Sequence, residues 1–255
     1  MTEQSSGPVV VITGASAGIG AALARELAGR HASLVLTARR EEILREMAAT
    51  LGAAVEVVPA DVTRRADVER VLERALARFG RVEVWVNNAG RGITRPSVLD
   101  ISDQDLEAML RDNTRSALYG MQVAVPHFQA RGQGVLVNVS SMLSRTPRAT
   151  MRAAYSASKA ALNSLTESLR FELAATHPNI RVVLVLPGVV ATEFGKNAIG
   201  GGPDSRTLPG AQSVEEVARV IADGLFSGPL DVYTRPEGIE PVLQHLRGLA
   251  GERPA

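Results

Sequence analysis

Residues 9–20 read Val-Val-Val-Ile-Thr-Gly-Ala-Ser-Ala-Gly-Ile-Gly, and this stretch decides the fold. The apolar run Val9–Thr13 predicts a buried strand, and the three glycines that follow predict a sharp turn into a helix. The free N–H groups and the dipole at the start of a helix favour a bound anion. A tight strand-to-helix turn without any ligand is the alternative, and the G-x3-G-x-G spacing alone does not exclude it.

Beyond this turn, β-branched runs alternate with longer amphipathic stretches. We expect strands at 9–13, 34–37, 55–58, 82–86, 135–139, 181–186 and 231–234. We expect helices at 18–30, 41–51, 66–79, 103–131, 154–176 and 214–226, and Pro126 should kink the last turns of the longest one. Strands that are apolar on both faces and separated by helices predict a doubly wound α/β fold, in which one parallel seven-stranded sheet carries helices on both faces.

The chain has 255 residues and no Pro/Ser-rich linker, so we expect a single domain over residues 1–255. Residues 1–7 and about 245–255 should form loose tails. The irregular segment 189–212 is too long for an ordinary connection, and we predict that it is a lid over the substrate. The lid contains Phe194, Gly195, Gly200, Gly201 and Gly202.

Composition excludes several classes of protein. With 28 basic and 27 acidic residues, the chain has no net field to hold a polyanion, so we expect no nucleic-acid partner. The chain has no cysteine, which excludes disulfides and thiolate zinc sites, and its four histidines are scattered, so we predict no metal. We find no run of 18 apolar residues, no signal-peptide core and no G-x-S-x-G elbow; we therefore expect a cytoplasmic protein without a membrane span and no serine-hydrolase chemistry.

Further motifs follow the glycine turn in a set order. They are Asp61-Val62, Asn87-Asn88-Ala89-Gly90, Asn113, Ser140-Ser141, Tyr155-x3-Lys159 and Pro187-Gly188. Together they resemble the short-chain dehydrogenases/reductases over about residues 9–226. The resemblance implies a Rossmann-type sheet, transfer of a hydride between a nicotinamide and a carbonyl or secondary alcohol, and a homotetramer or homodimer. A sugar-nucleotide epimerase of the longer related type is disfavoured, because the region after Phe226 is too short for a sugar-binding domain.

The end of the second expected strand indicates which nicotinamide is bound. In dinucleotide folds, an acidic residue about 20 positions after the glycines binds the ribose hydroxyls of NAD. Ala38 stands at that place here, followed by Arg39 and Arg40. A guanidinium offers a charge-assisted fork to a 2′-phosphate. We therefore predict NADP(H), with Arg39 as the main selector and Arg40 as support; a solvated basic helix start is the alternative. Ala17 occupies the place where many NADP-preferring relatives carry a basic residue.

The resemblance implies the remaining cofactor contacts. The pyrophosphate would lie on the turn formed by Gly14, Ser16, Ala17, Gly18, Ile19 and Gly20. Asp61 and Val62 would flank the adenine, although Asp61 can equally cap the following helix. The cofactor ribose would lie against Asn88, Ala89 and Gly90, and Asn88 can also tie neighbouring strands together. The nicotinamide would lie near Pro187, Gly188, Val190 and Thr192, the last of which could instead cap the lid.

The pair Tyr155 and Lys159 carries the acid–base prediction. Residues four apart on a helix share one face. A free tyrosine has a pKa of about 10, and we expect the nearby ammonium to lower the pKa of Tyr155 enough for proton transfer near neutral pH. By resemblance, Lys159 also binds the nicotinamide ribose, so both residues belong to the cofactor site as well.

Two further polar residues complete the expected catalytic set. Ser141 lies at the end of the fifth strand, 14 residues before Tyr155, where its hydroxyl can donate to a carbonyl oxygen. The usual spacing in the family is one residue shorter, so Ser140 is the alternative. Asn113 lies inside a predicted helix, where asparagine is unfavourable. By resemblance, it holds a water in a proton path through Lys159 to Tyr155; a satisfied polar contact is the alternative.

The sequence does not identify the substrate, which we expect to be a ketone or a 3-oxoacyl compound. Arg145, Arg148 and Arg152 precede the catalytic tyrosine. Arg152 is the nearest and is the candidate to bind an anionic substrate, although such a run is more often solvated. An NAD-linked alcohol dehydrogenase is the second reading. A nucleotide-binding protein without turnover is the third, and the complete Ser-Tyr-Lys set argues against it.

Overall fold

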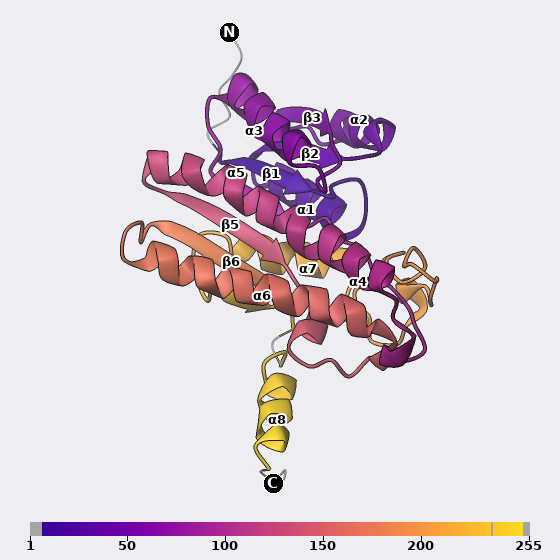
Figure 1. Ribbon diagram of the computed structural model, residues 1–255. Helices are drawn as coiled ribbons and strands as arrows, with labels where there is room; N and C mark the ends of the chain where they lie inside the picture. Colours follow the sequence, from indigo (N-terminus) through magenta and orange to yellow (C-terminus); the bar gives the residue numbers. More distant parts are fainter. Residues whose placement is uncertain (1–6, 236, 252–255) are drawn as a thin grey trace.

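The computed structural model describes residues 7–235 and 237–251. Its strands are β1 (Val9–Thr13), β2 (Ser33–Ala38), β3 (Val55–Pro59), β4 (Val84–Asn87), β5 (Gly134–Val139), β6 (Ile180–Leu186) and β7 (Asp231–Tyr233). Its main helices are α1 (Gly18–Gly29), α2 (Glu41–Thr50), α3 (Arg65–Phe79), α4 (Asp103–Met109), α5 (Ser116–Arg131), α6 (Ala153–Ala174), α7 (Val214–Asp223) and α8 (Glu240–Leu249) (Figure 1).

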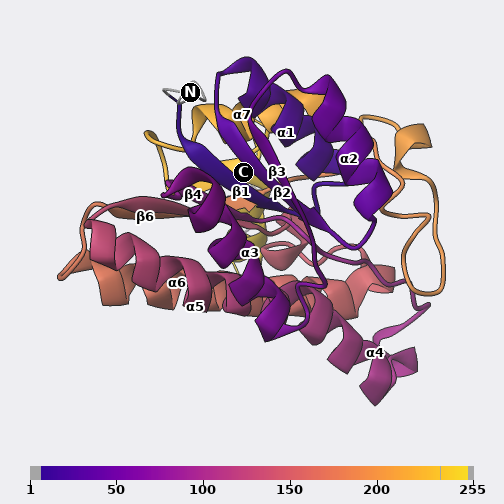
Figure 2. The same ribbon diagram turned by 90° about the horizontal axis from the view of Figure 1, so that it is seen from above.

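The seven strands form one parallel sheet in the order β3-β2-β1-β4-β5-β6-β7. Helices cover both faces: α1, α2 and α7 lie on one side, and α4, α5 and α6 lie on the other (Figure 2). The predicted doubly wound α/β fold is confirmed. The strand order reverses direction between β1 and β4, and ligands of such sheets bind outside the carboxyl ends of the strands at this point.

Alternate residues of each central strand pack into two separate cores. In β1, Val10 and Ile12 face the core beneath α1, α2 and α7. Val9 and Val11 face the core that α3, α5 and α6 close, which also contains the fully buried Trp85. Because both faces are buried, the central strands are apolar at nearly every position, as the sequence predicts for a covered parallel sheet.

A chain of buried side-chain hydrogen bonds crosses the second core. The amide of Asn87 accepts a 2.9 Å bond from Trp85 Nε1 and donates a 2.9 Å bond to Asn138 Oδ1. The amide of Asn138 then donates to Thr166 Oγ1 of α6 at 3.0 Å. These groups are buried and satisfied, so the network links β4 and β5 to the helix that carries the catalytic candidates.

The expected helix over 103–131 is interrupted. Residues Leu110–Arg115 form a π-helical segment, η2, between α4 and α5. The helix α5 continues through Pro126 and ends at Gly132, which has φ +72°. The interruption therefore lies about three turns before the proline, in the segment that contains Asn113.

The expectation of a loose tail from residue 245 is wrong for residues 245–249, which belong to α8. This helix was not foreseen from the sequence; it projects from the body of the molecule near the C-terminus (Figure 1) and buries Val242. Residues 1–6 of the predicted N-terminal tail and residues 252–255 of the predicted C-terminal tail lie outside the described residues. Within residues 7–235 and 237–251, no helix is both long and apolar enough to cross a membrane.

The close approach of α5 to the buried amide network predicts a destabilising substitution. An added Cβ at Gly120 would lie 2.0 Å from Asn87 Oδ1 and 2.7 Å from Trp85 Nε1. We expect Gly120→Ala to lower the free energy of unfolding by about 1–3 kcal/mol, because it overpacks a filled core. Urea-induced unfolding measures this change.

The matched control is Gly29→Ala, at the exposed end of α1, where an added Cβ meets no atom within 4 Å. We expect this variant to be neutral or up to about 1 kcal/mol more stable, because alanine is the better helix former. Equal stabilities for the two variants would show that α5 can move away from the sheet.

Candidate active site

The turn between β1 and α1 packs directly on the end of β4. Gly14 and Gly18 have φ angles of +65° and +55°. An added Cβ at Gly14 would lie 2.9 Å from the Cα of Ala89, and one at Gly20 would lie 2.5 Å from Asn88 Nδ2. Backbone conformation and crowding therefore both require glycine in this turn.

The first turn of α1 is open to an anion. Its N-cap residue, Ala17, makes no side-chain cap, and the turn contains no acidic residue. The free N–H groups and the helix dipole are therefore available to a phosphate. Thr192, which was expected at the nicotinamide, lies over this turn: an added Cβ at Gly18 would lie 3.3 Å from its methyl group.

The ends of β1 and β4 are tied together by side chains. Thr13 Oγ1 accepts hydrogen bonds from the backbone N–H groups of Asn88 (2.9 Å) and Ala89 (3.0 Å). Asn88 Nδ2 donates to the backbone oxygens of Thr13 (2.8 Å) and Gly14 (3.3 Å). The strand-tying role predicted for Asn88 is therefore confirmed. Thr13 was missed as a site residue, and its position directly before the first glycine was the available signal.

The two arginines after β2 behave differently. Arg40 Nη2 donates a 3.0 Å hydrogen bond to Ser16 Oγ in the glycine turn. Arg39 is exposed, and no side-chain hydrogen bond joins it to another described residue. The arginine that lies on the turn is therefore Arg40, which the sequence analysis gave only a supporting role.

Asp61 makes hydrogen bonds with residues that follow it closely in the chain. Its Oδ1 accepts hydrogen bonds from the backbone N–H (3.0 Å) and the hydroxyl (2.8 Å) of Thr63. Its backbone N–H donates a 2.9 Å bond to Asp67 Oδ2. These bonds form a turn before α3, whose N-cap residue Arg64 has no side-chain cap, so the helix-capping role considered for Asp61 is wrong. Val62 is half-buried against the core beneath α3.

The two serines after β5 point in different directions. Ser140 Oγ donates to Asn163 Oδ1 at 2.6 Å and is buried against α6. Ser141 instead makes a side-chain hydrogen bond with Tyr155, and it also accepts a 3.2 Å bond from the N–H of Leu143. The geometry therefore places Ser141, and not Ser140, beside the tyrosine.

Tyr155 and Lys159 are both almost fully buried, with 8% and 4% of their surfaces exposed. Burial raises the pKa of Tyr155 to about 12, and the hydrogen bond with Ser141 and the charge of Arg152 offset only part of this rise. Burial also lowers the pKa of Lys159 to about 8.

The expectation that Lys159 lowers the pKa of Tyr155 is wrong for this structure. Lys159 Nζ lies 6.0 Å from the centre of the Tyr155 ring and donates a 2.8 Å hydrogen bond to the carbonyl of Val139. The ammonium is therefore directed at the backbone of β5, and desolvation of the phenol outweighs the nearby charges.

Asn113 is fully buried in η2 and makes several hydrogen bonds. Its Oδ1 accepts a 2.8 Å bond from the N–H of Arg91, and its Nδ2 donates to the carbonyl of Arg91 (2.9 Å) and to Ser158 Oγ (3.0 Å). An added Cβ at Gly90 would lie 2.9 Å from Asn113 Oδ1 and 3.4 Å from Lys159 Nζ. The side chain thus fixes the loop after β4 against α6, and its position close to Lys159 agrees with the expected site.

The segment 189–212 lies over the same edge of the sheet. Pro187 accepts a 2.9 Å backbone hydrogen bond from Met142 in the serine loop. Val190 is buried and forms an isolated bridge with Gln212, which closes the base of the segment. Above this base, the ring of Phe194 contacts the ring of Tyr155 edge-on, with centres 5.5 Å apart. The segment therefore covers the tyrosine through Phe194, a contact that was not foreseen; its role as a lid over the substrate stays a prediction.

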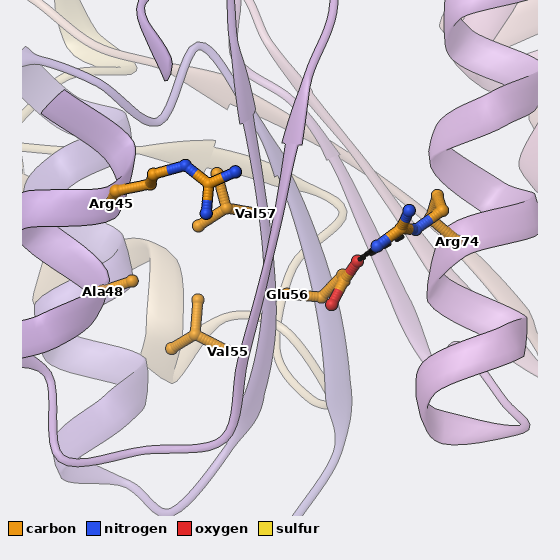
Figure 3. A pocket seen from close by; sticks show the side chains of 6 residues that line it. All are labelled: Arg45, Ala48, Val55, Glu56, Val57 and Arg74. Carbon is orange, nitrogen blue, oxygen red and sulfur yellow. Dashed lines mark hydrogen bonds and ion pairs between the residues drawn. The ribbon is translucent and has the colours of Figure 1, made fainter. Parts of the chain in front are cut away.

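No metal site accompanies these groups: within residues 7–235 and 237–251, no three His, Cys, Asp or Glu residues gather into a possible metal cluster. A shallow pocket of about 330 Å³ lies instead at the outer strand β3 (Figure 3). It is lined by Arg45, Ala48, Val55, Glu56, Val57 and Arg74, and Arg74 pairs with Glu56. Because β3 is an edge strand of the sheet, this pocket is separate from the groups at the ends of β4, β5 and β6.

Comparisons with known proteins agree with this arrangement. The family model described as "short chain dehydrogenase" matches residues 8–200. The uncharacterized oxidoreductase YxnA of Bacillus subtilis is 38% identical over 195 residues, which are 74% of this chain and 54% of that protein. The chain thus spans about half the length of this curated relative.

Two solved structures are similar over nearly the whole chain. A short-chain dehydrogenase from Sphingobium yanoikuyae in complex with NADPH is 31% identical, with a TM-score of 0.80, and 97% of this chain and 96% of that one are covered. A short-chain dehydrogenase/reductase from Burkholderia phymatum in complex with NAD is 26% identical, with a TM-score of 0.86, and 99% and 98% are covered. The two differ in the nicotinamide that they hold.

The buried ammonium of Lys159 predicts how stability changes with pH. Its pKa is about 8 in the folded chain against an ordinary value of 10.5, so the unfolded chain holds the proton more tightly between these values. The free energy of unfolding should therefore rise with pH from about 8 to about 10.5, by at most ~1.4 kcal/mol per pH unit. Below pH 8 both states are protonated, and the full cost of burying the charge is present.

Urea-induced unfolding of Lys159→Met between about pH 7.5 and 9.5 tests this assignment, because the variant should lose the rise. Staying below pH 10 avoids the opposite effect of Tyr155, whose raised pKa lowers stability from about pH 10 to 12. The control is Lys196→Met, which removes the other lysine of the chain from an exposed position and should keep the rise. A slope that survives in Lys159→Met would contradict the assignment.

Proposed function

Because this chain belongs to the short chain dehydrogenase family, we propose that it is an NADP(H)-dependent oxidoreductase that interconverts a carbonyl compound and a secondary alcohol. The observation that carries the proposal is the meeting of Ser141, Tyr155 and Lys159 at the carboxyl ends of the strands, under the lid. The nearby first turn of α1 has free N–H groups and no side-chain cap.

The residues present fit a dinucleotide. The first turn of α1, which has no side-chain cap, would hold the pyrophosphate. Gly14 and Gly20 have no side chain, so the backbone of this turn can pack on the end of β4. Gly90 would allow a ribose to lie near Lys159, and Thr192, at the start of the lid, would lie over the glycine turn. When bound, the nicotinamide supplies or accepts the hydride; the protein supplies orientation and proton transfer.

Tyr155 is suited to donate a proton in the direction of reduction. With a pKa of about 12, its phenol is fully protonated at neutral pH. Ser141 would donate a hydrogen bond to the substrate oxygen and stabilise the negative charge that develops there. Tyr155 would then deliver the proton to that oxygen, so the product is an alcohol.

Lys159 would return a proton toward Tyr155. Its pKa of about 8 lies close to neutral pH, so this amine can exchange a proton without a large cost. Asn113 fixes the loop after β4 directly against the ammonium, at a π-helical segment that leaves the helix hydrogen-bond pattern irregular. The proposed path therefore runs from the region of Asn113 through Lys159 to Tyr155.

The choice of NADP(H) rests on the basic residues after β2. Ala38 removes the carboxylate that would bind the ribose of NAD, and Arg40 already lies on the glycine turn through Ser16. A 2′-phosphate beside these groups would be bound by Arg40 together with the exposed Arg39. An NAD-linked alcohol dehydrogenase is the alternative, since one similar structure holds NAD.

We further propose a ketone or 3-oxoacyl substrate and a cytoplasmic homotetramer or homodimer. The exposed Phe171 on the outer helix α6, with 83% of its surface accessible, supports association through this helix. A nucleotide-binding protein without turnover is disfavoured, because the serine, tyrosine and lysine are all in place beside the glycine turn.

Substitution of the catalytic candidates tests the reaction. We expect Tyr155→Phe to lower kcat/KM for NADPH-dependent ketone reduction by about 10²–10⁴-fold, because it removes the proton donor. Ser141→Ala should cost about 10²–10³-fold through loss of the donor to the substrate oxygen. Stopped-flow or steady-state oxidation of NADPH over a ketone and aldehyde panel measures both.

The matched control is Ser140→Ala, which removes the neighbouring hydroxyl that faces Asn163. It should affect stability more than kcat/KM. Each variant is first shown to bind NADPH, so that a loss of turnover reports on chemistry. Full activity in Tyr155→Phe, or no turnover by the unaltered protein on any carbonyl compound, would contradict the proposed reaction.

Cofactor selection is tested by the dissociation constants of NADPH and NADH. We expect the unaltered protein to prefer NADPH, and Arg40→Gln to weaken NADPH by about 10- to 100-fold because a charge-assisted contact is lost. The Kd of NADH should change little. Arg39→Gln, measured in parallel, ranks the two arginines. Equal affinities for the two nucleotides in the unaltered protein would favour the NAD-linked alternative.

A further inference from the structure

Arg152 differs from the two arginines beneath and within the lid, Arg95 and Arg206, because no acidic side chain in the described part of the chain pairs with it. The guanidinium of Arg95, beneath the lid, forms a bidentate ion pair with Asp105. In the lid itself, Arg206 pairs with Asp204 and with Glu193. Each of these charges is therefore neutralised by neighbouring carboxylates.

The side chain of Arg152 is half-buried in the same region. Its Nη1 donates a 3.0 Å hydrogen bond to the carbonyl of Ile93. Among the residues that the structure describes, no carboxylate pairs with it, and its Nε and Nη2 have no partner. Burial lowers its pKa, and the charge that Tyr155 carries when it is ionised offsets part of this effect. These two donors are accessible, so the guanidinium can offer an anion two charge-assisted hydrogen bonds.

The guanidinium packs closely against two glycines, whose missing side chains let it lie there. An added Cβ at Gly92 would lie 3.2 Å from Arg152 Nη1 and 2.9 Å from the ring of Phe194. An added Cβ at Gly202, in the lid, would lie 2.9 Å from Nη2. The guanidinium thus lies between the loop after β4 and the lid, at the same place where Phe194 covers Tyr155.

The other two arginines of the loop before α6 do not share this position. Arg145 forms ion pairs with Glu167 and Asp231. Arg148 is exposed. Arg152 precedes Tyr155 by three residues, and its charge acts on the phenol. It is therefore the arginine of this loop that faces the proposed site of reaction.

We infer that Arg152 binds a carboxylate of the substrate, so that the protein acts on oxo acids whose carboxylate and ketone are separated by a short chain. The inference rests on the proposed function. The free Nε and Nη2 form one edge of a planar fork, which matches the two oxygens of a carboxylate. A phosphate would ordinarily need more positive charge than one guanidinium; the arginine of the lid, Arg206, is already paired, and Lys196 is exposed.

Matched pairs of acids and esters test the inference. The probes are acetoacetate, levulinate and 3-benzoylpropionate, each compared with its methyl ester in NADPH-dependent reduction. The unaltered protein should prefer at least one acid to its ester. In Arg152→Gln, kcat/KM for that acid should fall by about 10- to 100-fold, mainly through KM, while kcat/KM for the ester changes less than about threefold. Arg152→Lys should restore part of the preference, since it returns the charge without the fork.

The control is Arg148→Gln, which removes a charge from the same loop at an exposed position and should leave both substrates unaffected. Equal losses for acid and ester in Arg152→Gln would show that Arg152 only supports the lid, and would overturn the inference. If the variant does not fold, inhibition of the unaltered protein decides: pentanoate should compete with a neutral ketone, and pentanamide should not. Turnover of neutral ketones without preference for any acid overturns the inference alone, whereas absence of all turnover overturns the proposed function with it.

Discussion

The tie between the ends of β1 and β4 is the constraint on which the site depends. Thr13 Oγ1 holds two backbone N–H groups of the loop after β4, and Asn88 returns two hydrogen bonds to the backbone of the glycine turn. These bonds hold two parallel strands together at the point where the order of the strands in the sheet reverses. Any side chain at Gly14 or Gly20 would separate them. The first turn of α1 therefore opens directly beside the loop that carries Gly90.

Much of the fold was predictable because its signals are local. The apolar strands, the intervening amphipathic helices and the glycine turn each follow from residues that are close in sequence. The shared face of Tyr155 and Lys159 follows from helix geometry in the same way. In contrast, the π-helical segment at Asn113 depends on contacts with Arg91 and Ser158, which are distant in sequence. The helix α8 was missed for another reason, since Leu243, Leu246 and Val242 lie at helical spacing and gave a local signal that was available.

The sequence indicated which residues belong to the candidate site better than it indicated their hydrogen-bond partners and pKa values. Spacing alone left Ser140 and Ser141 open, because the direction of a hydroxyl after a strand depends on what the neighbouring helix offers; Asn163 binds the first. The ranking of Arg39 and Arg40 likewise depended on which side chain reaches Ser16. The pKa of Tyr155 could not be inferred from Lys159, because the lid residue Phe194 and the core around α6 remove water from the phenol.

Burial of Tyr155 and Lys159 connects stability with the proposed chemistry. Each group is driven toward its neutral form, so the folded chain holds an uncharged phenol and an amine whose pKa lies close to neutral pH. The ammonium of Lys159 can therefore return a proton to the phenolate that forms when Tyr155 protonates an acceptor, because the pKa of Lys159 lies below that of the phenol. Burying this ammonium also costs free energy. The cost appears as lost folding stability, and the satisfied amide network behind α6 helps to offset it. In this arrangement Arg152 is a half-buried guanidinium beside the covered region that no carboxylate in the described part of the chain balances, which is why an anionic substrate would complete it.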